Sequence, residues 1–242
     1  YLGMAPRRGQ PAAPADAAQA RKLMALLDLG RHADQPLASV GPALYRRIAL
    51  ARALASAPDV LLLDESAEWD CLKARAQWRA AFRDVRRKLR QTTLMVTADA
   101  ESAISMADRL VVMDGAQVRQ TGAVSDIYNF PSDAFVACSV GRCSLVPGEY
   151  TGPGQFRSSS GLELPCAHVD PQPAGPAVLA IRPENVELGP PMGGLRARVT
   201  DVTFLGSQIE YGLDMYGHPL SAVASTRTSG VPPLQPGASV DL

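Results

Sequence analysis

The stretch that decides the fold is Val60-Leu61-Leu62-Leu63-Asp64-Glu65, in which four apolar residues run directly into two adjacent carboxylates. Pro58-Asp59 precedes this run and Ser66-Ala67 follows it. A short apolar run with such boundaries predicts a β-strand that is buried on both faces of a sheet. Open α/β folds bind their ligands at the carboxyl ends of such strands, so Asp64 and Glu65 are candidate site residues.

Two neighbouring carboxylates at the rim of a sheet suit phosphate chemistry. Magnesium prefers carboxylate oxygens and water as ligands, and a second carboxylate beside the ion can orient or deprotonate an attacking water. The alternative is an ordinary buried strand whose last two residues meet solvent. The hexapeptide alone does not separate these two interpretations, and the rest of the chain has to decide between them.

The composition sets broad limits on what the chain does. With 242 residues it has room for one large domain or two smaller ones, and its formal net charge of zero gives no general attraction to nucleic acid or to an anionic membrane. The four cysteines lack C-x-x-C spacing, which indicates free thiols of a cytosolic protein and no zinc or redox motif. No run of about 18 apolar residues and no signal peptide occurs. Because the sequence starts at Tyr1, we expect it to be a piece of a longer product.

The spacing of apolar residues predicts two kinds of organisation along the chain. Up to residue 140, helices at 17–29, 43–55, 72–90, 101–107, 124–128 and 133–140 alternate with strands at 60–65, 92–97 and 109–113, which is typical of a parallel α/β sheet. Beyond Gly141, proline and glycine become frequent and short β-like runs recur at 177–181, 195–204, 208–213 and 220–224. This part predicts a small all-β domain, interpreted as a five-stranded barrel.

Four stretches together resemble one family, the ATP-binding subunits of ABC importers that carry a C-terminal barrel, as in polyamine, ferric-iron and sugar importers. They are residues 47–54 after the signature loop, 60–65 as the Walker B strand, 96–99 with 101–103 and 107–109 around the switch, and 180–184 with 202–206 in the barrel. The resemblance implies the latter part of a P-loop NTPase nucleotide-binding domain at residues 1–141, with its helical subdomain and parallel sheet. It implies an OB-like accessory or regulatory barrel at residues 142–242.

The same resemblance implies roles and partners. Asp64 would hold magnesium through water, and Glu65 would polarise the water that attacks the γ-phosphate of ATP. The subunit would lie on the cytoplasmic face of the membrane, bound to transmembrane permease subunits and a second nucleotide-binding subunit, and served indirectly by a solute-binding protein. We expect no nucleic-acid partner, because no aromatic residues alternate with the basic cluster at residues 86–88.

Several nucleotide-contacting positions depart from the family. No G-x-x-x-x-G-K-[ST] loop occurs in the 242 residues, so the triphosphate has no anion cradle here, and we expect the half that carries it to precede Tyr1. Gly41, Pro42 and Ala43 stand where the signature serine and glycines belong, and Pro42 lacks a backbone donor. Asp70 is one position out of register in the aspartate loop, and Ala98 replaces the switch histidine.

Two hypotheses of function follow from these motifs. In the first, the chain belongs to an importer subunit that couples ATP binding and hydrolysis to solute uptake. In the second, it is a catalytically inactive pseudo-ATPase or a remnant whose role is assembly or regulation. In either case, loss of the strand that leads into the phosphate loop would leave Val60–Leu63 without a neighbour and expose apolar surface, which predicts poor solubility or dependence on a partner.

Overall fold

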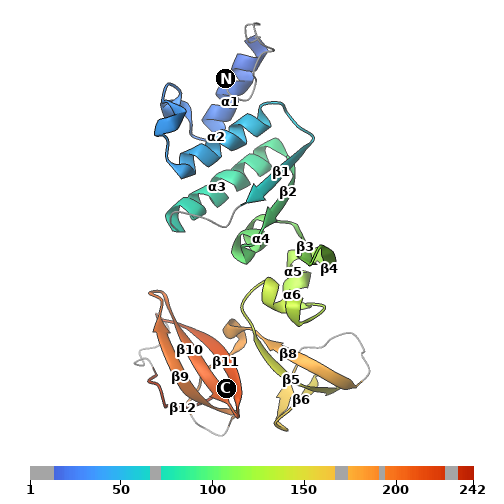
Figure 1. Cartoon of the computed structure of the whole chain (residues 1–242). Coiled ribbons are helices and arrows are strands. Elements are labelled where there is room, and N and C mark those ends of the chain that lie inside the picture. The colour runs from blue at the N-terminus through green and yellow to red at the C-terminus, as the bar shows by residue number, and fades with distance from the viewer. Residues whose placement is uncertain (1–13, 66–71, 167–173, 191–193, 227–233) are drawn as a thin grey trace. The chain divides into compact units, whose positions relative to one another are not determined.

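The chain forms two compact units, Tyr1–Ala107 and Asp108–Leu242 (Figure 1). The computed structural model describes residues 14–65, 72–166, 174–190, 194–226 and 234–242. The division into units falls before the strand at residue 109, so the helices around Pro131 belong to the same unit as the β-rich part. The division into family domains at residues 141 and 142 stays a prediction.

The first unit contains the predicted alternation of helices and strands. Its elements in chain order are α1 (Pro14–Leu26), η1 (Gly30–His32), η2 (Leu37–Ser39), α2 (Pro42–Leu54), β1 (Val60–Glu65), α3 (Leu72–Leu89), β2 (Thr92–Thr97) and α4 (Ala100–Met106). Strands β1 and β2 pair in parallel, with a register that runs from Val60 opposite Thr92 to Glu65 opposite Thr97. The predicted parallel α/β arrangement is therefore confirmed for this unit.

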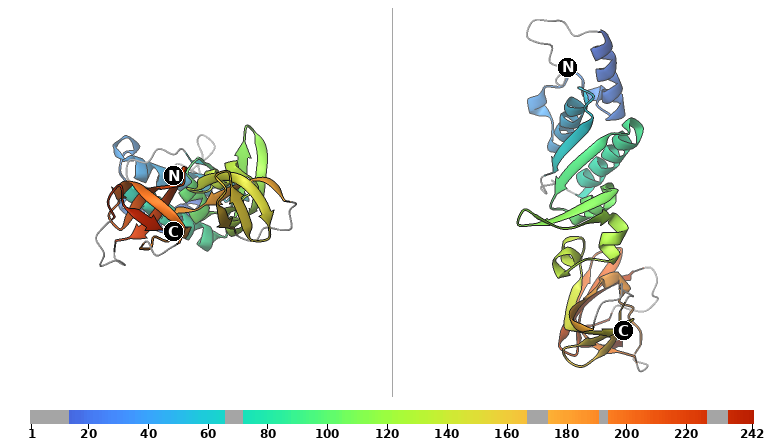
Figure 2. Two further views of the ribbon diagram at one scale, coloured as in Figure 1. Left: turned by 90° about the horizontal axis from the view of Figure 1, so that it is seen from below. Right: turned by 90° about the vertical axis from the view of Figure 1, so that its right-hand side faces the viewer.

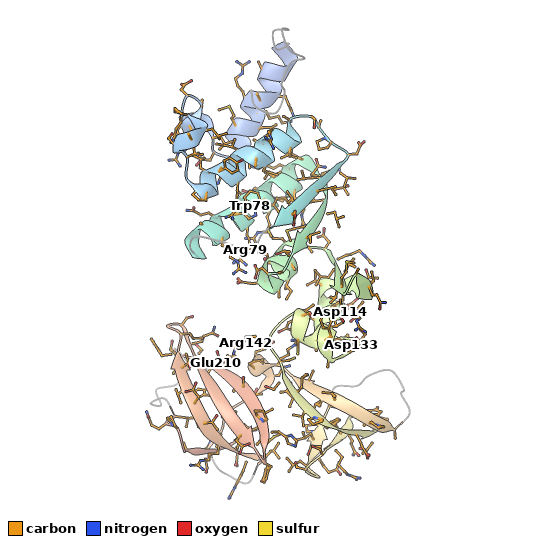
Figure 3. The ribbon with its side chains drawn as sticks, in the orientation of Figure 1. Trp78, Arg79, Asp114, Asp133, Arg142 and Glu210 are labelled. Carbon is orange, nitrogen blue, oxygen red and sulfur yellow. The ribbon has the colours of Figure 1, made fainter. Side chains whose placement is uncertain are left out.

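The core of the first unit lies on one face of the β1–β2 sheet. Leu61 is 3% exposed and packs in a cluster with residues of α1, α2, α3 and α4, among them Leu23, Leu50, Phe82 and Val85. Trp78 stacks on Phe82 with 6.0 Å between the ring centroids and covers the edge of this cluster (Figure 3). In the right-hand view of Figure 2, α3 runs alongside the two strands.

The other face of the sheet is apolar and exposed. Leu62 is 71% exposed and stands opposite Leu94, which is 58% exposed; Val60 and Val96 are also exposed. The prediction that this strand is buried on both faces is therefore wrong, because successive side chains alternate and only the Leu61 side meets helices. The expectation of exposed apolar surface within Val60–Leu63 is confirmed for Val60 and Leu62. We call Val60, Leu62, Leu94 and Val96 the bare sheet face.

The second unit begins with a hairpin and two short helices and continues into β-structure. Its elements are β3 (Arg109–Asp114), β4 (Gln117–Ala123), α5 (Val124–Asn129), α6 (Ala134–Ser139), β5 (Ser144–Gly152), β6 (Gln155–Ser158), β7 (Glu163–Pro165), β8 (Gly175–Ile181), η3 (Pro183–Asn185), β9 (Arg196–Phe204), β10 (Gln208–Met215), β11 (His218–Ser225) and β12 (Ser239–Asp241). Strands β3 and β4 form an antiparallel pair joined by a tight turn at Gly115, whose φ is 52°.

The β-part of the second unit has more strands than the sequence predicts. Its described strands form two four-stranded antiparallel sheets, in the orders β7-β6-β5-β8 and β11-β10-β9-β12, around one shared core that includes Val146, Val199 and Leu213. The interpretation as a five-stranded barrel is therefore wrong in strand number. Pro147, Gly148 and Gly152 within β5 weaken its sequence signal, and β7 and β12 are only three residues long.

A buried arginine ties the helices of the second unit to its sheets. Arg182, which is 6% exposed, donates from Nη1 to the carbonyl oxygens of Ala137 (2.8 Å) and Arg142 (3.2 Å) and from Nη2 to that of Tyr128 (3.2 Å). Its guanidinium also lies 4.2 Å from the centroid of the Tyr128 ring, and the Tyr128 hydroxyl donates to Glu184. Three carbonyls and a ring face satisfy this buried cation, which would otherwise be costly to bury.

An ion pair at the same junction lies at the surface. Arg142, next to the backbone that Arg182 holds, donates from Nη1 to the Glu210 carboxylate at 2.6 Å, and this bond connects the start of β5 with β10 (Figure 3). The pair holds the pKa of Glu210 below its ordinary value, chiefly through this hydrogen bond. Because the Arg142 side chain is largely exposed, we assign it less importance than Arg182.

Adjacent residues of β1 test the one-sided packing of the sheet. We expect Leu61→Ala to lower the free energy of unfolding by about 2–4 kcal/mol, because it leaves a cavity in the helix-covered core. We expect Leu62→Ala to cost less than about 1 kcal/mol, because that side chain is already exposed. Denaturant titration followed by circular dichroism measures both values. Equal losses for the two variants would mean that the bare sheet face is covered.

Candidate nucleotide site

The parallel register brings two of the predicted site segments to one rim of the sheet. Asp64 pairs with Val96 and Glu65 with Thr97, so the carboxyl ends of β1 and β2 coincide. Ala98 and Asp99 follow directly on β2 at this rim, and Asp64 is exposed there. The end of β1 and the predicted switch segment therefore lie next to each other, as expected for a ligand site at the ends of parallel strands.

The switch segment is held by hydrogen bonds of Asp99 and not by Ala98. Asp99 caps α4, since its Oδ2 accepts from the Ser102 backbone N–H at 3.0 Å, and its own N–H donates to Thr97 Oγ1 at 3.0 Å. Ala98 is exposed, and its methyl group offers no hydrogen bond to a phosphate. Asp99 therefore fixes the backbone of the predicted switch segment, while position 98 presents only a methyl group.

Two arginines of α3 also bind the start of α4 through ion pairs. Arg75 forms an ion pair with Asp99 and lies 3.4 Å from Glu101, while Arg79 Nη2 lies 2.8 Å from Glu101 (Figure 3). Burial favours the neutral form of Asp99, but the hydrogen bonds from Ser102 and Arg75 outweigh it and hold the pKa of Asp99 below its ordinary value. These arginines are thus engaged by carboxylates. In the sequence, the only indication of these hydrogen bonds and ion pairs is that Asp99 precedes Ser102 by three residues at a helix start.

The residues predicted to replace the signature loop form an ordinary helix start. Gly41 is the residue before α2, with φ −73° and ψ 164°, and its carbonyl accepts from the Tyr45 N–H at 3.0 Å. Pro42 occupies the first helical position, where its missing N–H breaks no intrahelical bond, and Ala43 is partly buried. The substitution preserves the helix but reduces the number of N–H groups at its N-terminus that are available to an anion. Asp70 lies outside the described residues.

The residues present supply one end of a nucleotide site. The exposed Asp64 carboxylate fits a partly hydrated magnesium ion, which needs only one or two carboxylates besides phosphate oxygens. Within the described parts of the chain, no group of three or more histidine, cysteine, aspartate or glutamate side chains is arranged to hold a metal. With no phosphate loop in the sequence, these residues do not form a complete site for ATP and magnesium.

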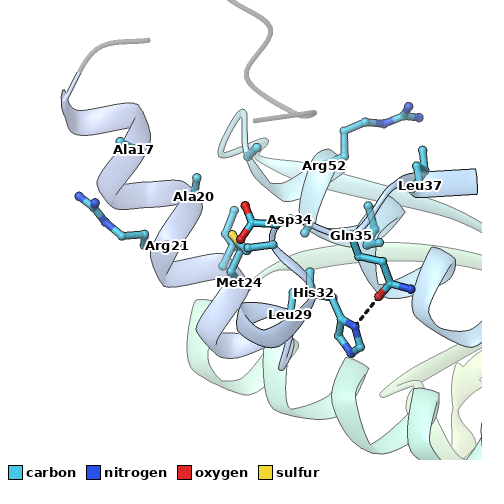
Figure 4. Close-up of a pocket in the computed structure, with 15 residues that line it drawn as sticks. Ala17, Ala20, Arg21, Met24, Leu29, His32, Asp34, Gln35, Leu37 and Arg52 are labelled. Carbon is cyan, nitrogen blue, oxygen red and sulfur yellow. Dashed lines mark hydrogen bonds between the residues drawn. The ribbon is translucent and has the colours of Figure 1, made fainter. Parts of the chain in front are cut away.

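A separate pocket lies between α1, the two short 3-10 helices and α2 (Figure 4). Its volume is about 340 Å³, and its lining is mainly apolar, with Ala20, Met24, Leu29 and Ile48 among the contributors. His32 Nδ1 and Gln35 Oε1 lie 2.8 Å apart on its border. None of the predicted site residues lines this pocket, and no sequence pattern indicates it, because its walls come from elements brought together by folding.

The charge of Asp99 makes the free energy of unfolding of the first unit depend on pH. Because the folded-state pKa is lowered, the contribution of Asp99 is present above the unfolded-state pKa of about 4 and is lost as the pH falls through the folded value. We expect Asp99→Asn, which keeps a capping side chain, to be less stable than wild type at pH 7, with a gap that closes toward pH 3. Thermal unfolding across this range measures it. As a control, Asp59→Asn should change stability by less than about 0.5 kcal/mol at pH 7, since Asp59 is exposed and lies outside this network. A gap for Asp99→Asn that is as large at pH 3 as at pH 7 would contradict the role of its charge.

The chain has relatives among import ATP-binding proteins. Residues 179–242 match the TOBE domain family. The chain is 36% identical over 225 residues to the sulfate/thiosulfate import ATP-binding protein CysA 2 of Chromobacterium violaceum, covering 90% of this chain and 59% of that protein. It is 35% identical over 202 residues to the spermidine/putrescine import ATP-binding protein PotA 1 of Pseudomonas aeruginosa, covering 81% and 55%. It is 33% identical over 203 residues to the Fe(3+) ions import ATP-binding protein FbpC of Brucella abortus, covering 81% and 56%.

These relatives indicate which family the chain resembles and how much of their length it matches. The chain spans between 55% and 59% of the length of these three relatives. Among the described residues, no helix is long and apolar enough to cross a membrane. The similarity runs through both units, and the order of elements agrees with the latter part of a P-loop NTPase domain followed by an OB-like domain. The relatives of this chain are thus ATP-binding subunits of ABC importers, and the chain is similar to the latter part of such a subunit, with a match to the TOBE domain family at residues 179–242.

Proposed function

We propose that this chain supplies the Walker B, switch and TOBE portion of an ATP-binding subunit that drives solute import. The observation that carries the proposal is the shared rim at which Asp64-Glu65 and Thr97–Asp99 end their strands. This pairing of a carboxylate-bearing strand end with a switch segment is what a subunit that responds to a nucleoside triphosphate requires. The relatives are named for three different solutes, so we propose no particular solute for this chain.

In this proposal the two adjacent carboxylates have distinct roles. Asp64, exposed at the rim, is the residue that would contact the hydrated magnesium ion accompanying ATP. Glu65, the last residue of β1, would orient the attacking water. The N–H groups and lysine that would hold the phosphates are not among the 242 residues, so the residues present do not complete a hydrolytic step.

The bare sheet face supports participation of further polypeptide in the working subunit. Val60, Leu62, Leu94 and Val96 place four large apolar side chains on one uncovered face, each at least half exposed. Contiguous apolar surface of this kind is unusual on a folded unit that works alone. We propose that its occupant is polypeptide equivalent to the roughly two fifths of the relatives' length that this chain does not match.

The alternative function is a catalytically inactive subunit that acts in assembly or regulation. Gly41, Pro42 and Ala43 at the start of α2, together with Ala98 at the rim, favour it, because each replaces a residue type that would contact phosphate in the family. Loss of one such group typically costs about a hundred- to a thousandfold in rate. Turnover measurements distinguish the two functions.

ATP turnover by the full chain, alone and mixed with a phosphate-loop segment, tests the proposal. The segment is the part of CysA 2 from Chromobacterium violaceum that this chain does not match. We expect no Glu65-dependent turnover by the chain alone, because the phosphate cradle is missing. In the mixture we expect turnover that falls about 100-fold or more in Glu65→Gln.

Asp59→Asn is the matched control, because Asp59 is an exposed carboxylate at the other end of the same strand. It should leave the rate of the mixture unchanged. Formation of a complex, shown by size-exclusion chromatography, without Glu65-dependent turnover would contradict the catalytic proposal and favour the inactive subunit.

We also propose that the pocket between α1 and α2 receives a segment of the membrane permease. The support is its concave shape, its apolar lining and its place on helices away from the carboxylate rim. In Figure 4 the side chains of Arg21 and Arg52 extend outward, and the Asp34 carboxylate lines the pocket together with Ala20, Met24 and Leu29. An apolar side chain from a permease loop fits such a surface, as anchor residues commonly fill apolar pockets at protein interfaces.

Neighbouring residues of α1 test this docking site. We expect Ala20→Asp to weaken retention of the chain on membrane vesicles that contain the permease by about tenfold or more, because it places a charge against an apolar contact. Lys22→Asp is the control, since Lys22 is exposed on the same helix and does not line the pocket. Co-sedimentation measures retention, and equal retention of both variants would contradict the proposed contact.

A further inference from the structure

Two cysteines of the second unit lie in contact although their spacing in the sequence fits no known dithiol motif. The Sγ atoms of Cys138 and Cys143 are 3.3 Å apart. Cys138 is exposed in the last turn of α6, and Cys143 is partly buried immediately before β5. A disulfide requires a sulfur–sulfur distance of about 2.05 Å, so only a small approach separates the two thiols from bond formation.

Arg182 fixes the backbone on both sides of this thiol pair. Its Nη1 donates to the carbonyl oxygens of Ala137 and Arg142, and each of these residues immediately precedes one of the cysteines. Val136 and Val140, which frame the turn, are buried, and the Val140 N–H donates to the Val136 carbonyl at 3.1 Å. The proximity of the thiols therefore comes from a held backbone, which raises the effective concentration of one thiol at the other.

The two thiols differ in their access to a reagent. Burial and then the Cys138 sulfur raise the pKa of the Cys143 thiol to about 11, although the Arg182 guanidinium acts in the opposite direction. Cys143 is therefore protonated at neutral pH and is shielded from solvent. The exposed Cys138 sulfur is the one that a molecule in solution meets first.

We propose that Cys138 and Cys143 form a dithiol site that exchanges with low-molecular-weight disulfides of the glutathione type and closes into an intramolecular disulfide. The Cys138 thiolate attacks one sulfur of the reagent, forms a mixed disulfide and releases one thiolate. Cys143, after losing its proton to solvent, attacks the Cys138 sulfur, forms the Cys138–Cys143 bond and releases the second thiolate. Two protein thiols are oxidised, and one reagent disulfide is reduced to two thiols.

The bond would act on a defined junction of the second unit. It would join the end of α6 covalently to the start of β5, across the same turn that Arg182 holds by hydrogen bonds. This inference does not depend on the proposed nucleotide chemistry, because Asp64, Glu65 and the switch segment belong to the other unit.

Mass spectrometry of the full chain after incubation with oxidised glutathione tests the site. Trypsin cuts after Arg119, Arg142 and Arg157, so the bond would link the otherwise separate peptides 120–142 and 143–157. We expect this linked pair, with a loss of about 2 Da from the intact chain, to form at a glutathione disulfide concentration about tenfold or more below that which modifies Cys166.

Single variants separate the two steps. Cys143→Ser should stop at a stable glutathione adduct on Cys138, and Cys138→Ser should give neither the adduct nor the linked peptides. Cys166→Ser, which changes a partly buried thiol elsewhere in the unit, should leave the linked pair unchanged. A wild-type chain that accumulates the glutathione adduct on Cys138, or that links Cys138 to a different cysteine, would overturn the proposal.

Discussion

The parallel pairing of β1 with β2 requires that both faces of the sheet in the first unit be covered, because parallel sheets are stable in that arrangement. The helices of the unit cover the Leu61 face alone. The same pairing sets the geometry of the candidate site, since the register alone brings Asp64-Glu65 to the rim that carries Thr97 and Asp99. Backbone hydrogen bonds therefore hold the rim in place without any help from residues that touch nucleotide. The backbone at this rim therefore keeps its conformation although Ala98, next to Thr97, offers no side-chain hydrogen bond.

The sequence predicts best where one local pattern settles the structure. The strands at 60–65 and 92–97 have the predicted bounds, because each is a short run of apolar and β-branched residues too short for a helix. Helices α2 and α3 lie within one residue of their predicted ranges. The strands β5, β6, β7 and β12 escaped prediction because proline, glycine or brevity hides their alternation. The apolar run itself does not show that β1 is buried on one face only. A run of leucines has the same sequence whether one face of the strand is covered or both.

The candidate site shows the same division between local and tertiary information. The rim that unites Asp64 with the switch follows from strand order, so it was accessible to sequence reasoning. The ion pair of Arg75 with Asp99, the pocket beside Met24 and the contact of Cys138 with Cys143 all depend on how separate elements approach one another. Arg182 is an intermediate case, because residues 182–184 carry the family resemblance while their structural role, a cation satisfied by three carbonyls, appears only in three dimensions.

The bare sheet face also bears on how long a copy of this chain persists inside a cell. Apolar strand surface that stays uncovered is what chaperones and quality-control proteases bind, and marginal differences in such exposure change protein abundance several-fold. A partner polypeptide that covers Leu62 and Leu94 would hide this signal, whereas a copy without a partner would keep displaying it. The exposed surface would thereby link the lifetime of a copy to its assembly, because a copy without a partner would be degraded sooner than one whose sheet face is covered.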